Sequence, residues 1–155
     1  MRFSELFSIV HCVKSADHGS GVDSDSINMG QVHNVIFTLS VGSVTGDAVL
    51  KLYSGATNGT KTTAETFNYR LASADQGTAL TADQYGAWTT SAALTLTAAT
   101  YDNKILLVEL KAEELTDGQE WLTMEISSAA SNIFVSVVAY CRGRFQGFNI
   151  PTVLG

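Results

Sequence analysis

The feature that most constrains the fold is the length and pattern of the apolar segments. Nearly all of them are short, rich in Val, Ile, Leu, Phe, Tyr and Thr, and bounded by Gly, Asn, Asp or Ser. In HNVIFTLSV (33–41), apolar and polar residues alternate, and Val35, Phe37, Leu39 and Val41 fall on one face. That alternation is typical of a half-buried strand, and no segment has a convincing helical period. The chain is therefore predicted to be all-β.

We expect strands at residues 5–13, 33–41, 47–55, 64–71, 94–97, 104–111, 121–126 and 132–140. The Asn58-Gly59 pair predicts a hairpin between the strands 47–55 and 64–71. Residues 72–93 have weak periodicity and are expected to form a long excursion with one short strand; loops of this length are usually functional. About eight strands separated by turns predict a single-domain β-sandwich of jelly-roll type with extended terminal segments.

Length and charge limit the classes of function. A chain of 155 residues fits one domain, which we assign to residues 1–141, followed by an extended C-terminal arm at 142–155. The net charge of −6 argues against a nucleic-acid partner, because the nine Lys and Arg residues are spread along the chain. No apolar run approaches the length of a membrane span, and Glu5, Ser8 and His11 interrupt any signal-peptide core. We expect a soluble protein made in a cytoplasm, with no membrane partner.

The stretch GVDSDSINMG (21–30) begins like a calcium-binding loop. An EF-hand loop that starts at Asp23 needs oxygen ligands at positions 3, 5 and 12 and a glycine at position 6. Asp25 fits position 3, but Ile27, Asn28 and Asn34 occupy positions 5, 6 and 12. We therefore expect no metal here but a solvated turn that leads into a strand.

No combination of residues has the spacing of a catalytic site. His11, His18 and His33 form neither an HxH nor an HExxH pattern, and GxSxG, P-loop and GxGxxG motifs are absent from the sequence. Cys12 and Cys141 lie in apolar runs, where they are either buried free thiols or a disulfide that joins the first and last strands. We expect the protein not to be an enzyme and to use no cofactor.

Two groups of aromatic and apolar residues are candidates for an interface. Tyr85 and Trp88 lie among small residues in DQYGAW, where they either anchor a protein interface, stack on a sugar or cover one end of the core. The arm RGRFQGFNIPTVLG (142–155) has a density of apolar groups that is awkward in water. It is expected to lie on a neighbouring subunit, on the surface of another partner or on its own sandwich, with Phe145 and Phe148 as anchors beside Ile150 and Pro151.

With the strands placed, the chain resembles the head decoration, or cement, proteins of tailed phages, which are small all-β virion proteins. The resemblance covers most of residues 20–155. It rests on DSDSINMGQVHNVIFTLSVGSVTGDAVLKLYSGAT, FNYRL, LTLTAATYDNKILLVEL and YCRGRFQGFNIPTVLG. Phage proteins of similar texture include tail components.

The resemblance implies a role but transfers no catalytic residues. It implies a protein that binds the outer surface of the phage head, stabilises it by joining adjacent capsomers and is assembled in the host cytoplasm. The implied partners are the major capsid protein and further copies of this chain, as a homotrimer. The alternative is a carbohydrate-binding or receptor-binding tail module in which Tyr85 and Trp88 stack on a sugar.

Overall fold

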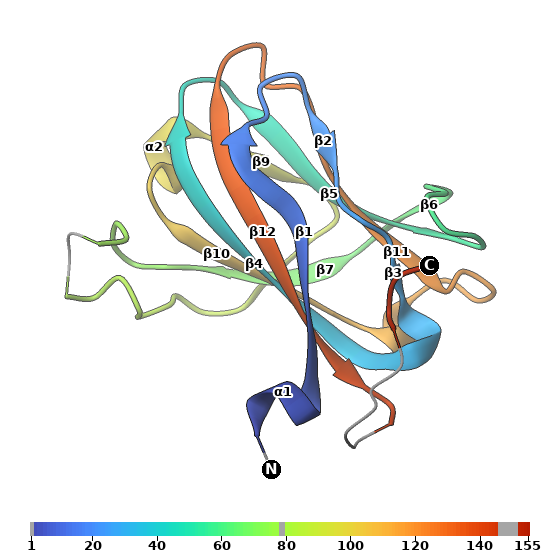
Figure 1. Ribbon diagram of the computed structural model, residues 1–155. Coiled ribbons are helices and arrows are strands. Elements are labelled where there is room, and N and C mark those ends of the chain that lie inside the picture. The colour runs from blue at the N-terminus through green and yellow to red at the C-terminus, as the bar shows by residue number, and fades with distance from the viewer. Residues whose placement is uncertain (1, 78–79, 146–151) are drawn as a thin grey trace.

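The computed structural model describes residues 2–77, 80–145 and 152–155, and it confirms the predicted all-β sandwich (Figure 1). Sheet A contains, in spatial order, β1 (Phe7–Asp17), β12 (Ile133–Gly143), β4 (Val32–Val44), β10 (Ile105–Lys111), β7 (Phe67–Leu71) and β8 (Thr89–Ser91). Sheet B contains, in spatial order, β2 (Val22–Asp23), β11 (Trp121–Ile126), β5 (Ala48–Gly55) and β6 (Thr63–Glu65), with β3 (Ile27–Asn28) paired to β11 and β9 (Leu94–Leu96) to β5. The helical turns are α1 (Phe3–Leu6), η1 (Met29–Gln31), α2 (Ala98–Tyr101) and η2 (Ala112–Glu114).

The strands pair from the two ends of the chain inward, and every pair is antiparallel. β1 pairs with β12, β2 and β3 with β11, β4 with β10, and β5 with β9. A long two-stranded ribbon that folds over on itself produces this nested order, which we interpret as a jelly roll. The tip of the ribbon carries β6, β7 and β8, and the last two extend sheet A beyond β10.

The alternation of side chains along the strands builds the core between the two sheets. Val35, Phe37, Leu39 and Val41 of β4 are all fully buried, and the residues between them are half-buried. β12 and β10 alternate in the same way. Each of these strands of sheet A therefore has one face in the core and one outer face.

The predicted hairpin after residue 55 is confirmed only in its first half. β5 pairs with β6, and Gly59 in the connection has φ +79°, which suits glycine. The expected single strand 64–71 is wrong, because the chain leaves sheet B after β6 and continues as β7 in sheet A. The segment therefore bridges the two sheets.

The C-terminal residues 152–155 pack on this chain's own sandwich. The amide of Asn28 donates a hydrogen bond to the Val153 carbonyl at 2.7 Å, and the Val153 side chain is buried in the core. β12 continues to Gly143 and so includes the first two residues of the expected arm, 142 and 143. Phe148, Ile150 and Pro151 lie outside the described residues.

Candidate interaction surface

The outer face of sheet A, which we call face A, carries a central group of apolar side chains flanked by polar ones, among them His11, Glu109 and Arg70. Ile9 opposes Tyr140, and Tyr140 opposes Ile36, so these three side chains form one row across β1, β12 and β4. In the adjacent row, Val138 opposes Thr38, which opposes Leu107. The residues that alternate with them along the strands are buried, so both rows point outward.

An aromatic cluster extends face A at the edge of the sheet. Helix α1 brings Phe3 onto Phe7, with ring centroids 4.6 Å apart in a stacked arrangement, and onto the edge of Tyr140 at 5.8 Å. The Glu5 carboxylate accepts a hydrogen bond from the Arg2 amide at 2.8 Å and so closes this helical turn. Phe3 and Ile9 remain 55% and 54% exposed, which is unusual for such large apolar side chains on one patch.

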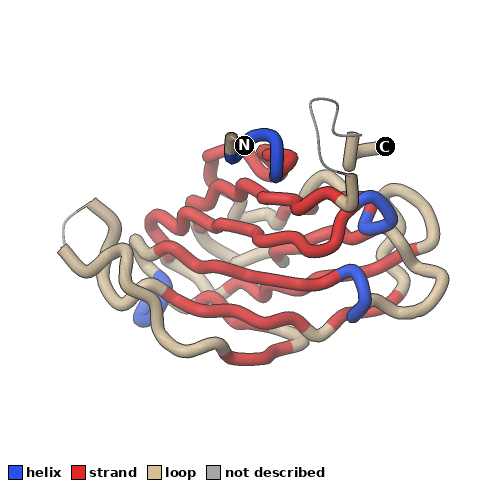
Figure 2. The backbone as a smooth tube through the Cα atoms, turned by 90° about the horizontal axis from the view of Figure 1, so that it is seen from below, coloured by secondary structure: helices blue, strands red, loops and turns tan. Residues whose placement is uncertain are grey.

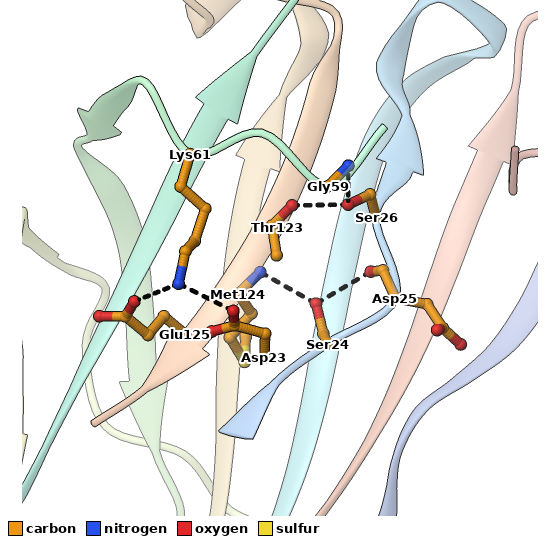
Figure 3. A network of polar contacts seen from close by, with 9 residues as sticks. All are labelled: Asp23, Ser24, Asp25, Ser26, Gly59, Lys61, Thr123, Met124 and Glu125. Carbon is orange, nitrogen blue, oxygen red and sulfur yellow. Dashed lines mark hydrogen bonds and ion pairs between the residues drawn. The ribbon is translucent and has the colours of Figure 1, made fainter. Parts of the chain in front are cut away.

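The outer face of sheet B, which we call face B, carries charged and hydroxyl side chains, and Gly59 and Lys61 of the chain's own loop lie against it (Figure 3). The Lys61 ammonium lies 2.8 Å from the Asp23 carboxylate and 2.5 Å from the Glu125 carboxylate. It also lies 5.8 Å from the centroid of the Tyr53 ring, which is on the same face. The loop 56–62 therefore lies over the outer side of β5 and β11.

The expected solvated turn at GVDSDSINMG is wrong, because β2 and β3 pair with β11 in this stretch. Ser24 and Ser26 are buried; the Ser24 hydroxyl accepts from the Met124 amide at 2.9 Å, and that of Ser26 accepts from the Gly59 amide at 3.0 Å (Figure 3). Ser26 Oγ also lies 2.7 Å from Thr123 Oγ1. The polar residues of this segment thus tie β11 to the loop over face B.

Tyr85 and Trp88, the aromatic residues singled out in the sequence, are brought together by Arg70. The Arg70 guanidinium lies 5.3 Å from each of the two ring centroids, and its Nη2 donates to the Tyr85 carbonyl at 3.2 Å. Trp88 is 45% exposed, whereas Tyr85 is half-buried and forms a bridge with Ala72. Sequence analysis missed Arg70, which lies on the outward side of β7 opposite Leu107.

The candidate residues occupy two separate places. Tyr85 and Trp88 lie beside β7, and β10 and β4 separate that strand from β12. Phe145 follows β12 and is 60% exposed. Face A is the surface between these two places, and sequence analysis had not identified it as a site.

The reactive side chains are accounted for by structural roles. Burial raises the pKa of the Cys12 and Cys141 thiols to about 12, and both are free thiols rather than a disulfide. His18 is buried with Nε2 2.8 Å from the Lys14 carbonyl oxygen. Within residues 2–77, 80–145 and 152–155, no three His, Cys, Asp or Glu side chains are arranged to hold a metal ion.

No protein-family model, curated protein or solved structure matches the chain. None of the helices that the structure describes has the length and apolar character needed to cross a membrane. The geometry of face A is therefore the observation from which a function is argued.

Proposed function

We propose that the protein is a structural virion protein that binds the outer surface of a tailed-phage head and joins adjacent capsomers. The observation that carries the proposal is face A, a sheet surface with a central apolar group, on a sandwich whose opposite face carries charged and hydroxyl side chains. Interface centres are enriched in aromatic residues, and Phe3, Phe7 and Tyr140 gather on face A. A sheet is also rigid, so little order is lost when such a face binds.

Burial of the exposed apolar side chains of face A would contribute a useful binding free energy when several copies bind to one head. Fully burying one exposed Phe or Ile side chain is worth roughly 1.5 to 3 kcal/mol. Phe3, Ile9 and Phe134 are between 43% and 55% exposed, so a partner that covers them gains part of that energy at each. Multivalent attachment of several copies to one head would multiply the effect.

The proposed assembly is a homotrimer whose partner is the major capsid protein on the virion surface. Because Val153 is held on its own sandwich, the arm contributes to this assembly through Phe145, which is exposed. Face A supplies the larger contact.

The test compares two identical substitutions on the two faces. Val138 and Val49 are both half-buried and outward-facing, on β12 and β5 respectively. Val138→Glu should prevent trimer formation and binding to undecorated heads, because it buries an unpaired charge, whereas Val49→Glu should bind as the wild type does. Light scattering reports the trimer, co-sedimentation with heads built from the capsid protein of the same genome reports binding, and circular dichroism confirms folding. A wild-type protein that stays a 16.5 kDa monomer and does not sediment with heads contradicts the proposal.

A carbohydrate-binding or receptor-binding tail module is the second candidate, and the exposed Trp88 favours it. Arg70 holds the Trp88 ring in place, and a pre-ordered exposed aromatic ring suits stacking on a sugar. On a glycan array, specific binding by the wild type that Trp88→Ala abolishes would support this candidate. An array on which neither protein binds would contradict it.

A further inference from the structure

β4 begins, and β10 and β12 end, at the end of sheet A nearest α1 (Figure 1). At this end lies an open hollow with a volume of about 500 Å³, which is lined by His33, Asn34, Lys111, Ala112, Glu113, Arg142 and Arg144. Three of the nine Lys and Arg residues of an acidic chain therefore meet in one place.

The strand register places two of these cations on either side of one residue. Asn34 opposes Arg142 on β12 and Lys111 on β10. Neighbouring strands lie about 4.8 Å apart, so both side chains rise from the sheet within reach of the same ligand. Cys141 and Leu110, the preceding residues, are buried, and Arg142 and Lys111 consequently point outward.

Few anions of the chain itself compensate these cations. Lys111 has one ion pair, at 3.9 Å to the exposed Glu113, which is a weak interaction. Among the residues that the structure describes, the Arg142 guanidinium has no hydrogen-bond or ion-pair partner. Two other carboxylates lie nearby: Glu109 accepts a hydrogen bond from the Asn34 side-chain amide at 3.0 Å, and Glu114 accepts one from the Lys111 backbone amide at 2.8 Å. Among the described residues, neither forms an ion pair with the three cations. The residues that line the hollow therefore carry three positive charges against the single carboxylate of Glu113.

Arg144 is held in position by the start of β4. Its backbone amide donates to the Gln31 carbonyl at 3.0 Å and its Nε donates to the Val32 carbonyl at 3.2 Å. A guanidinium anchored through Nε keeps its two terminal nitrogens for a ligand. A planar donor of this kind matches the two oxygens of a carboxylate.

An aromatic residue neighbours one cation of the hollow. Phe7, which stacks on Phe3, opposes Arg142 across β1 and β12, and Phe145, which is exposed, follows Arg144 in the sequence. A nucleic acid is disfavoured as the ligand, because the chain carries a net charge of −6 and three cations neutralise few phosphates. A ligand with a single carboxylate beside an apolar group can contact both the cations of the hollow and the neighbouring aromatic side chain.

We propose that this hollow binds a carboxylate that a partner protein carries next to an apolar side chain. The inference rests on the proposed function, in which that partner covers face A, and it names the chemistry by which the partner is recognised at one end of that face. The site orients the partner, because charge specifies register where an apolar face alone does not.

The experiment is a titration of the full ¹⁵N-labelled chain, followed through the backbone amides of Asn34, Lys111, Arg142 and Arg144. The probes are 3-phenylpropionate, its neutral analogue 3-phenylpropionamide, and inorganic phosphate at matched ionic strength. We expect saturable shifts with the carboxylate and none with the amide, and weaker binding of phosphate, which lacks the apolar group. Equal binding of the amide, equal binding of phosphate, or no saturable shift with the carboxylate overturns the inference.

Variants assign the effect to the hollow. Arg142→Gln and Lys111→Gln should each weaken 3-phenylpropionate binding about fivefold, as expected for the loss of one charge-assisted hydrogen bond. Lys14→Gln removes an exposed cation on β1 outside the hollow and should leave binding unchanged. Uniform effects of all three variants would contradict a local site. If Val138→Glu abolishes head binding but the titration fails, the proposed function stands and this inference alone is wrong.

Discussion

The two outer faces of the sandwich differ in how far other parts of the chain cover their side chains. On face B, a lysine from the loop 56–62 bridges two carboxylates, and a serine pairs with a threonine hydroxyl beneath the same loop. On face A, Ile9, Tyr140 and Ile36 form one row and Val138, Thr38 and Leu107 form the next, without such a cover. The chain thus covers part of one face with its own loop and leaves large apolar side chains, such as Phe3 and Ile9, exposed on the other.

The path of the ribbon tip explains this difference. The loop between β5 and β6 turns back over sheet B, where its Gly59 amide reaches Ser26. Part of the longer segment between β7 and β8 projects beyond the β7 edge of the sandwich (Figure 2). Its Gln76 returns to β4, where the side chain accepts a hydrogen bond from the Ser40 hydroxyl at 2.9 Å. This segment therefore places Trp88 beside face A and contacts that face at Ser40.

The largest expected effect on stability distinguishes a core residue on the inner side of sheet A from its neighbour on face A. Phe37 is fully buried and its neighbour Ile36 points outward from the same strand, β4. Phe37→Ala should lower the free energy of unfolding by about 3 to 5 kcal/mol, because it removes a large core side chain and leaves a cavity. Ile36→Ala should lower it by less than about 1 kcal/mol. Urea denaturation measures both, and equal losses would show that face A belongs to the core.

The next prediction concerns the reactivity of the two buried thiols, one of which lies on β1, the edge strand that carries Ile9. Burial raises the pKa of Cys12 on β1 and of Cys141 on β12 from 9.0 to about 12, which lowers the thiolate fraction about a thousandfold near pH 8. Iodoacetamide should therefore leave the folded protein unmodified and label both thiols after unfolding in urea, as mass spectrometry would report. Rapid labelling without urea would mean that β1 opens and that face A is not a stable surface.

The sequence predicted the strands well, because their burial is local information. β11 at Trp121–Ile126 coincides with the expected strand, and β4, β5 and β10 differ from theirs by a few residues at the ends. β2, β3 and the sheet change at Thr66 were missed, because two-residue strands have no period and a crossover is decided by tertiary packing.

The site was predictable only in part. Trp88 and Tyr85 stood out as aromatic residues among small ones, but nothing in FNYRL indicates that Arg70 lies between them. Face A consists of the residues that alternate with the core positions along each strand. A half-buried strand usually has polar residues at such positions, but here three of them are Ile36, Leu107 and Val138. Their position in one surface depends on strand register, which no single segment specifies.

A smaller effect tests the cover of face B. Ser26→Ala removes the acceptor of the Gly59 amide and the partner of the Thr123 hydroxyl, and should cost about 1 to 3 kcal/mol because buried polar groups lose their partners. Adding Thr123→Val should cost less than the sum of the two single changes, since the pair then has no unpartnered hydroxyl. Chemical denaturation of the two single variants and the double variant measures the coupling. Additive losses would mean that the two hydroxyls do not interact.

The smallest expected effect is that of the ion pairs on face B. Lys61→Ala should lower the free energy of unfolding by about 0.2 to 1 kcal/mol, because the pairs with Asp23 and Glu125 are partly exposed to water. Hydrogen bonds to Asp23, and then to Glu125, raise the pKa of Lys61, so this contribution is present below its ordinary value of 10.5 and is lost as the pH rises through the raised value. The difference between wild type and variant should also shrink in 1 M NaCl. Denaturation at low and high salt measures it, and Lys14→Ala, an exposed lysine of β1 without an ion pair among the described residues, is the control. A loss at Lys61 that is as large as the loss at Ser26 and independent of salt would show that the lysine is a buried anchor of the loop rather than a surface charge.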